Sequence, residues 1–117
     1  MSISIKNISL MVNEEVYLND ISLDFEPGST NIFLGRTLAG KTSLLRIMAG
    51  LDRPDKGKIF VNGDDVTGLS VRKRNISMVY QQFINYPSFT IYENIASPLK
   101  ILGTDKKEMD RRVREVA

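Results

Sequence analysis

The chain has 117 residues, of which 42% are apolar, and a formal net charge of +2. This length supports one modest hydrophobic core, and the small charge with scattered basic residues argues against nucleic acid as a partner. Cysteine and histidine are absent, which excludes disulfides, zinc fingers, thiol chemistry and any mechanism in this chain that needs an imidazole base. There is no secretory leader and no apolar run near the ~18 residues of a membrane span, so we expect neither a secreted nor a membrane-spanning chain.

The first part of the chain predicts antiparallel strands. Apolar and polar residues alternate over residues 3–12, with a one-residue slip at Lys6-Asn7 that indicates a β-bulge. A second alternating strand covers residues 21–26, and the turn at residues 27–28 leads into a third, buried strand at residues 31–34.

Residues 35–42 read G-x-x-x-x-G-K-T, the phosphate-binding P-loop motif. The apolar run before it and the helix-like residues 43–49 after it supply the strand–loop–helix context that the motif requires. The alternative is a glycine-rich surface turn. The motif assigns no task to Arg36 or Leu38, and we expect a solvated arginine. The candidate nucleotide-binding residues are Gly35, Arg36, Thr37, Leu38, Ala39, Gly40, Lys41, Thr42 and Ser43.

The specified residues of this loop each have a chemical task. Gly35 and Gly40 allow positive φ angles and a close approach of phosphate oxygens to the main chain. The main-chain N–H groups then form an anion nest at the positive end of the following helix. Lys41 is expected to reach the β- and γ-phosphates as a binding and catalytic cation. The Thr42 hydroxyl is expected to complete a Mg²⁺ shell, and Ser43 to donate to the α-phosphate.

Further local signals follow the loop. The helix of residues 43–49 ends at Gly50. Residues 58–61 predict a strand, Asn62-Gly63 indicates a hairpin, and residues 76–80 predict another short strand. We interpret the basic residues 72–74 as an exposed turn, with a headgroup or phosphate contact as the alternative.

Two helices are predicted in the last third of the chain. Thr90 with Glu93 forms a capping box that opens the first, and Pro98 is expected to kink that helix or end it at Ser97. Asp105 with Glu108 opens the second. Its apolar stripe comprises Met109, Val113, Val116 and Ala117. The periodic pattern runs to the last residue, so we expect one domain or the front of one.

Several motifs come in an order more specific than the P-loop alone. They are Gly50-Leu51-Asp52-Arg53-Pro54, Asp65-Val66-Thr67-Gly68-Leu69, Met78-Val79-Tyr80-Gln81-Gln82, Tyr86-Pro87-Ser88-Phe89-Thr90 and Tyr92-Glu93-Asn94-Ile95-Ala96. In these motifs and their order, the chain resembles the ATP-binding subunit of an ABC transporter of the carbohydrate-import type. The resemblance implies an α/β fold: a P-loop NTPase of ABC type, with an N-terminal antiparallel β-subdomain and the start of the P-loop core, truncated. Residues 1–117 would be a single, incomplete domain.

The resemblance also implies cofactors, partners and roles. The cofactors would be ATP and Mg²⁺. Gln81 matches the glutamine that completes the Mg²⁺ shell and senses the γ-phosphate, with Gln82 as an alternative. The partners would be a second ATP-binding subunit and transmembrane permease subunits. The permease subunits would contact the region Phe83 to Asn94, at the cytoplasmic face of the inner membrane. The aromatic residues Phe83, Tyr86 and Phe89 would serve that interface or pack beneath a loop.

The chain departs from the family pattern in two respects. The family stacks adenine on an aromatic residue at a position that aligns near Val12, and Tyr17 is the only aromatic residue nearby. The signature motif, the acidic Walker B strand and the switch histidine of the family lie further downstream. We therefore expect this chain to bind nucleotide without hydrolysing it.

Three functions remain open on these observations. The leading one is part of an importer ATPase for a sugar or polyol, because residues 35–43 and 81–87 resemble a subgroup that handles glycerol and related compounds. The others are a stand-alone nucleotide-binding module and an ABC protein acting on ribosomes or DNA damage. The strand at residues 31–34 lacks a neighbouring strand, so we also expect an apolar edge prone to association.

Overall fold

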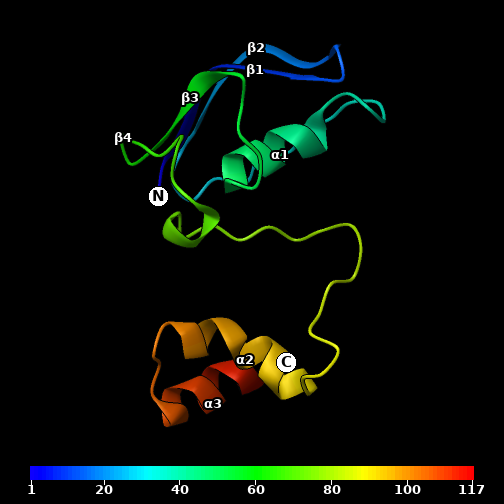
Figure 1. Ribbon diagram of the computed structural model, residues 1–117. Coiled ribbons are helices and arrows are strands. Elements are labelled where there is room, and N and C mark those ends of the chain that lie inside the picture. The colour runs from blue at the N-terminus through cyan, green and yellow to red at the C-terminus, as the bar shows by residue number, and fades with distance from the viewer. The chain divides into compact units, whose positions relative to one another are not determined.

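The computed structural model describes residues 1–117, which form two compact units, residues 1–79 and 80–117. The first unit holds a β-sheet and helix α1, and the second holds helices α2 and α3 (Figure 1). Each unit buries a hydrophobic cluster of its own. None of the helices has the length and apolar content needed to cross a membrane.

The sheet of the first unit comprises β1 (Ile3–Val12), β2 (Glu15–Phe25), β3 (Lys56–Val61) and β4 (Asp64–Asp65). Its strand order is β2-β1-β3-β4, and every neighbouring pair is antiparallel. The predicted bulge in β1 is confirmed, because the register with β2 shifts between Ile5 and Ile8 and Asn7 has a φ of 53°. The extra residue lets Ile5 and Ile8 both face the core, although residues three positions apart lie on opposite faces of a regular strand.

Helix α1 (Lys41–Ala49) packs on this sheet (Figure 1). Ile5, Ile8 and Ile59 of the strands and Ile47 of the helix are completely buried. Burying one such side chain favours folding by about 2 kcal/mol. The P-loop helix is therefore held on the sheet by apolar packing.

The predicted end of α1 is confirmed. Gly50 has a φ of 84°, and its N–H donates to the carbonyl of Ile47 at 3.1 Å. The N–H of Leu51 donates to the carbonyl of Arg46 at 2.9 Å. These bonds satisfy carbonyls that the helix itself leaves unpaired.

The hairpin predicted at Asn62-Gly63 is also confirmed. Both residues have positive φ angles, 50° and 83°, and they join β3 to the short strand β4. Asn-Gly is the preferred pair for a two-residue turn with this backbone geometry.

The strands predicted at residues 31–34 and 76–80 are wrong, because neither segment pairs with a strand in this structure. A strand exists only through its ladder partner, which alternation of side chains alone does not supply. In the first segment, Ile32 and Leu34 are 77% and 90% exposed. The expectation that this segment is buried is therefore wrong for these two residues, and association through it stays a prediction.

The interpretation of residues 72–74 as an exposed turn needs one correction. Val71–Lys73 form a short 3-10 helix, in which Arg72 and Lys73 are exposed. Arg74 is instead buried, with 4% of its surface exposed, and its guanidinium donates to main-chain carbonyls. Burial also lowers the pKa of Arg74 from its ordinary value.

The second unit is built on α2 (Ile91–Ile101) and α3 (Lys106–Val116). The capping box that opens α2 is confirmed, since the N–H of Glu93 donates to the Thr90 hydroxyl at 3.1 Å and the N–H of Thr90 donates to the Glu93 carboxylate at 2.8 Å. The helix does not end at Ser97, because Pro98 lies inside it. Proline cannot donate to the carbonyl of Asn94, and the Ser97 hydroxyl takes over that bond at 3.1 Å.

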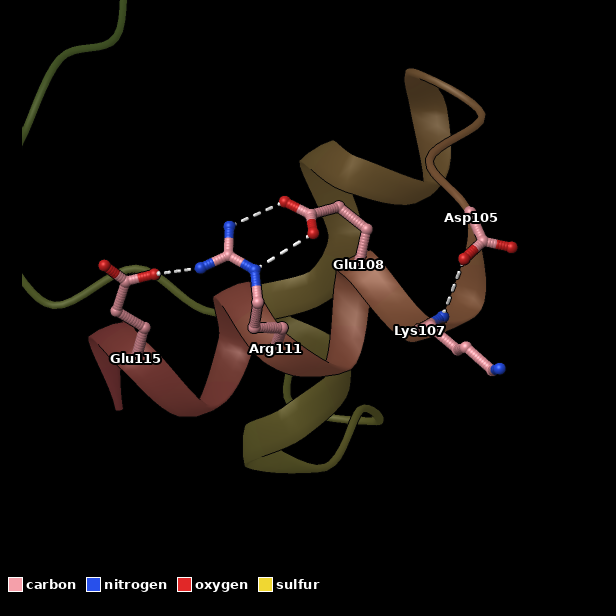
Figure 2. A network of polar contacts seen from close by, with 5 residues as sticks. All are labelled: Asp105, Lys107, Glu108, Arg111 and Glu115. Atoms are coloured by element: carbon pink, nitrogen blue, oxygen red, sulfur yellow. Dashed lines mark hydrogen bonds and ion pairs between the residues drawn. The ribbon is translucent and has the colours of Figure 1, made fainter.

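Asp105 is the N-cap of helix α3, and its carboxylate accepts from the N–H of Lys107 at 3.1 Å, whereas its predicted capping partner Glu108 accepts from Arg111 instead (Figure 2). On its surface, Arg111 forms ion pairs with Glu108 and Glu115 (Figure 2). The predicted apolar stripe holds for its first two members, Met109 and Val113, which are buried against α2. It is wrong for Val116 and Ala117, which are exposed because no element of this unit covers the last turn.

Candidate phosphate-binding loop

Residues 35–40 form a tight loop between the unpaired segment 31–34 and the first turn of α1. The N–H of Ala39 donates to the carbonyl of Arg36 at 3.1 Å, which closes the loop on itself. Leu38 and Gly40 have positive φ angles, 69° and 86°. Positive φ turns successive N–H groups toward one side, which is the geometry of an anion nest.

Gly40 is the residue through which this loop contacts the sheet. A Cβ added to Gly40 would lie 2.6 Å from the carbonyl oxygen of Tyr17 and 2.9 Å from Cδ2 of Leu18. Only glycine fits there, both because of the contact and because of the positive φ. The loop therefore rests on the main chain of β2.

Lys41 reaches back into the curve of the loop. Its ammonium donates to the carbonyl of Gly35 and, at 2.8 Å, to the carbonyl of Arg36. A Cβ at Gly35 would lie 3.2 Å from Cβ of Ala39, which is a tight contact, and 3.7 Å from Nζ of Lys41, which is an ordinary one. The positive charge is thus already inside the loop, where a phosphate would be bound.

The first turn of α1 offers uncapped donors. Its N-cap is Gly40, which has no side chain to accept from the helix N–H groups, and its first turn contains no acidic residue. Helices α2 and α3, by contrast, begin with side-chain caps, Thr90 and Asp105. An anion at the start of α1 would satisfy donors that the chain leaves free.

The hydroxyl residues of this turn differ in exposure: Thr42 is exposed and Ser43 is half-buried. No group of three or more histidine, cysteine, aspartate or glutamate side chains capable of holding a metal ion is present. Mg²⁺ at this loop would therefore depend on phosphate oxygens and water, with Thr42 as a protein ligand, which is the manner in which nucleotide sites usually hold it. The donor set fits a magnesium–nucleotide complex better than a free metal ion.

An open hollow of about 620 Å³ lies beside the start of α1. Lys41 and Thr42 border it, but residues 35–40 do not, and most of its wall is apolar, including Phe25, Phe33 and Met48. The rings of Phe25 and Phe33 are 5.9 Å apart. This hollow adjoins the unpaired segment 31–34 and is not itself the phosphate cradle.

The two positions considered for adenine stacking differ in environment. Val12 is half-buried and packs against the core cluster, so its side chain contributes to the fold. Tyr17 is exposed, and its main chain touches Gly40.

The remaining candidate residues belong to the second unit. Gln81 and Gln82 are exposed, as are Phe83, Tyr86 and Phe89, and none of the three aromatic residues takes part in the core of that unit. The rings of Tyr86 and Phe89 are in contact, with centroids 4.9 Å apart.

Asn94 organises this aromatic turn, a role that sequence patterns do not reveal. Its amide oxygen accepts from the N–H of Tyr86 at 2.7 Å, and its amide nitrogen donates to the carbonyls of Tyr86, Phe89 and Thr90. A side-chain amide that bonds to main-chain groups up to eight residues away cannot be inferred from spacing alone.

An antiparallel sheet followed by a P-loop and a helix bearing Lys41 and Thr42 is the fold of a P-loop NTPase of the ABC type. The structure is similar to a dimeric, post-hydrolysis state of the ATP-binding cassette MJ0796 bound to ADP and Pi, with a TM-score of 0.83 and 25% identity, over 97% of this chain and 54% of that chain. The chain belongs to the ABC transporter family, whose model matches residues 18–117.

The chain is also similar to parts of several import ATP-binding proteins. It is 45% identical over 103 residues to the molybdate/tungstate import ATP-binding protein WtpC of Pyrococcus horikoshii, covering 88% of this chain and 30% of that protein. It is 39% identical over 115 residues to the sulfate/thiosulfate import ATP-binding protein CysA of Pseudomonas syringae pv. tomato, covering 98% of this chain and 35% of that protein. The Fe(3+) ions import ATP-binding protein FbpC of Photorhabdus laumondii is 37% identical, over 97% of this chain and 32% of that protein. The chain thus spans about a third of the length of these relatives.

Proposed function

We propose that this chain is the phosphate-binding part of the ATP-binding subunit of an ABC importer. The observation that carries the proposal is the start of α1, where an uncapped set of helix N–H donors, the Lys41 ammonium and the Thr42 hydroxyl lie together on a loop seated against β2. No side-chain cap and no acidic residue of the first turn satisfies the helix N–H donors, and a triphosphate would.

Different residues of the loop would bind different parts of the magnesium–nucleotide complex. Lys41 would exchange its carbonyl partners, Gly35 and Arg36, for β- and γ-phosphate oxygens. The N–H groups of residues 40–43 would donate to the phosphates without competition from a side-chain cap. Thr42 would hold Mg²⁺, which neutralises phosphate charge when bound, and the family resemblance implies Gln81 as a further ligand.

We assign nucleotide binding, rather than turnover, to these 117 residues. Hydrolysis requires a group that positions water, and the signature motif, the acidic Walker B strand and the switch histidine that the resemblance implies are not among these residues. In the intact importer, ATP hydrolysis would drive uptake, with a second ATP-binding subunit closing the site; the dimeric state of MJ0796 supports this arrangement.

The permease subunits would dock on the region Phe83 to Asn94, at the cytoplasmic face of the inner membrane. The exposed aromatic residues of this region support the proposal, because aromatic side chains are enriched at protein interfaces. For the cargo we propose a sugar or polyol of the glycerol type, on the resemblance of residues 35–43 and 81–87. The relatives named above carry the names of oxyanion and iron importers and lend this cargo no support.

The direct test is a titration of the chain with a fluorescent ATP analogue in the presence of Mg²⁺. Wild-type chain is expected to bind it, and Lys41→Ala to lose binding while keeping its fold. Lys73→Ala removes an exposed lysine of the same unit and serves as the matched control. Equal affinity of Lys41→Ala and wild type would contradict the assignment of the loop.

A further inference from the structure

Arg74 is buried without a carboxylate partner. Its guanidinium donates to four main-chain carbonyls: those of Leu69 and Thr67, both at 3.1 Å, and those of Ile47 and Met48 at 3.1 and 3.2 Å. Arginine is almost never fully buried unless it is paired, because taking its charge out of water is costly. Here the carbonyl dipoles of two separate segments replace the counter-ion.

One of those segments is the C-terminal end of α1. The carbonyls of Ile47 and Met48 are among the last four of the helix, where intrahelical donors run out and negative partial charge collects. The basic residue within that last turn, Arg46, forms an ion pair with Asp52 at 2.7 Å. Arg74 is thus a second cation at this helix end, supplied from 26 residues further along the chain.

The other segment, residues 67–69, is tied to the sheet. The Thr67 hydroxyl accepts from the N–H of Ile59 in β3 at 2.9 Å, and the N–H of Thr67 donates to the Asp65 carboxylate at 3.0 Å. Because the carbonyl of Thr67 also receives the guanidinium, Arg74 links the end of α1 to β3. Its planar set of N–H groups reaches carbonyls in several directions at once, which a lysine ammonium at the same place does not match.

Gly50 makes room for this link. A Cβ at Gly50 would lie 2.7 Å from Nε and 2.9 Å from Cζ of Arg74. The guanidinium cannot move aside, because four hydrogen bonds hold it.

We propose that Arg74 is a positioning residue of the phosphate site, resting on the function proposed above: it fixes the far end of α1, so that the helix start stays aimed at the phosphates. Gly40 seats the near end of the helix on β2, and Arg74 secures the other end to β3. A helix of nine residues is about 13 Å long, so a tilt of about 20° about the fixed Gly40 moves the far end by about 4 Å and turns the N–H donors of the first turn by the same angle. Binding geometry tolerates only about 10–20° of misorientation.

The test uses Arg74→Lys, which keeps the charge but not the planar fork, with Arg72→Lys as the matched control on the exposed neighbour. Affinities for Mg·ATP and for inorganic tripolyphosphate are measured, with circular dichroism reporting the folded fraction. We expect Arg74→Lys, while folded, to lose about tenfold or more in affinity for both ligands, and Arg72→Lys to match wild type. Folded Arg74→Lys with wild-type affinities would overturn the proposal, since a purely structural role lowers stability alone.

A second measurement covers the case in which Arg74→Lys does not fold. In wild-type chain, the NMR signal of the Arg74 Nε–H group is expected to shift when tripolyphosphate saturates the loop, whereas that of exposed Arg72 is not. A stationary Arg74 signal at saturation would contradict the proposed coupling. If wild-type chain binds neither ATP nor tripolyphosphate, the proposed nucleotide function itself fails, which is a separate outcome.

Discussion

Gly40 of the P-loop lies directly against the main chain of Tyr17 in β2, so close that a Cβ would come within 2.6 Å of the Tyr17 carbonyl oxygen. The motif explains Gly40 by its contact with phosphate. The structure adds a second reason, which is that the loop touches the sheet at this residue.

Gly40→Ala should therefore destabilise the first unit as well as weaken phosphate binding. Gly28→Ala is the matched control, since Gly28 also has a positive φ, 72°, but has open space around it. The control should cost about 1 kcal/mol for backbone strain alone, and Gly40→Ala measurably more, in urea unfolding. Equal losses for the two variants would show that the contact with Tyr17 contributes nothing.

The local features of the fold were predictable from sequence, and the long-range ones were not. Gly50, Asn62-Gly63 and the Thr90–Glu93 box act within a few residues, so their chemistry is visible in the order of residues alone. The strands expected at residues 31–34 and 76–80 depend on distant partners, and the burial of Arg74 depends on carbonyls up to 27 residues away. For the candidate site, the sequence predicts which residues form the loop, but not the seat on Tyr17 or the link through Arg74.

The capping box of α2 should make the stability of the second unit pH-dependent. The main-chain N–H of Thr90 donates to the Glu93 carboxylate and so lowers the pKa of Glu93 below its ordinary value of 4.5. A carboxyl group with a lowered pKa stabilises the fold above its unfolded-state pKa and loses that contribution as the pH falls through the folded-state value. Thermal melts from pH 7 down to pH 3 should show a smaller decline in Glu93→Gln than in wild type, and identical declines would refute this role.

Thr90→Ala removes the hydroxyl that accepts from the N–H of Glu93. Loss of such a cap costs about 1 kcal/mol. Ser88→Ala, two residues earlier and exposed, is the control and should be neutral. Helix content at 222 nm during urea unfolding is the measurement, and an unshifted midpoint in Thr90→Ala would count against the cap.

Asn94→Ala should loosen the aromatic turn of residues 86–90, because four hydrogen bonds to its main chain are lost together. Chymotrypsin cleaves after aromatic residues that are not followed by proline, so cleavage after Phe89 should become several-fold faster, because local hydrogen-bond protection is lost. Asn85→Ala changes a neighbouring exposed amide and should leave the rate unchanged. A wild-type rate in Asn94→Ala would show that the turn holds without this side chain.

The exposed side chains of Ile32 and Leu34 should promote association of the chain, since unpaired apolar segments recruit partners. The double substitution Ile32→Thr with Leu34→Ser should reduce concentration-dependent association in sedimentation velocity. Ile101→Thr removes an equally exposed residue from the end of α2 and is the control. Association that persists unchanged in the double variant would assign it to another surface.

The central claim is that the loop of residues 35–43 binds nucleotide phosphates through α1 and Lys41. Its most direct test is an amide NMR titration of the chain with Mg·ATP, compared with adenosine in the same Mg²⁺ buffer. We predict saturable shifts of the amide signals of residues 38–43 with Mg·ATP and none with adenosine. Stationary loop signals at millimolar Mg·ATP, or shifts confined to other residues, would contradict the account.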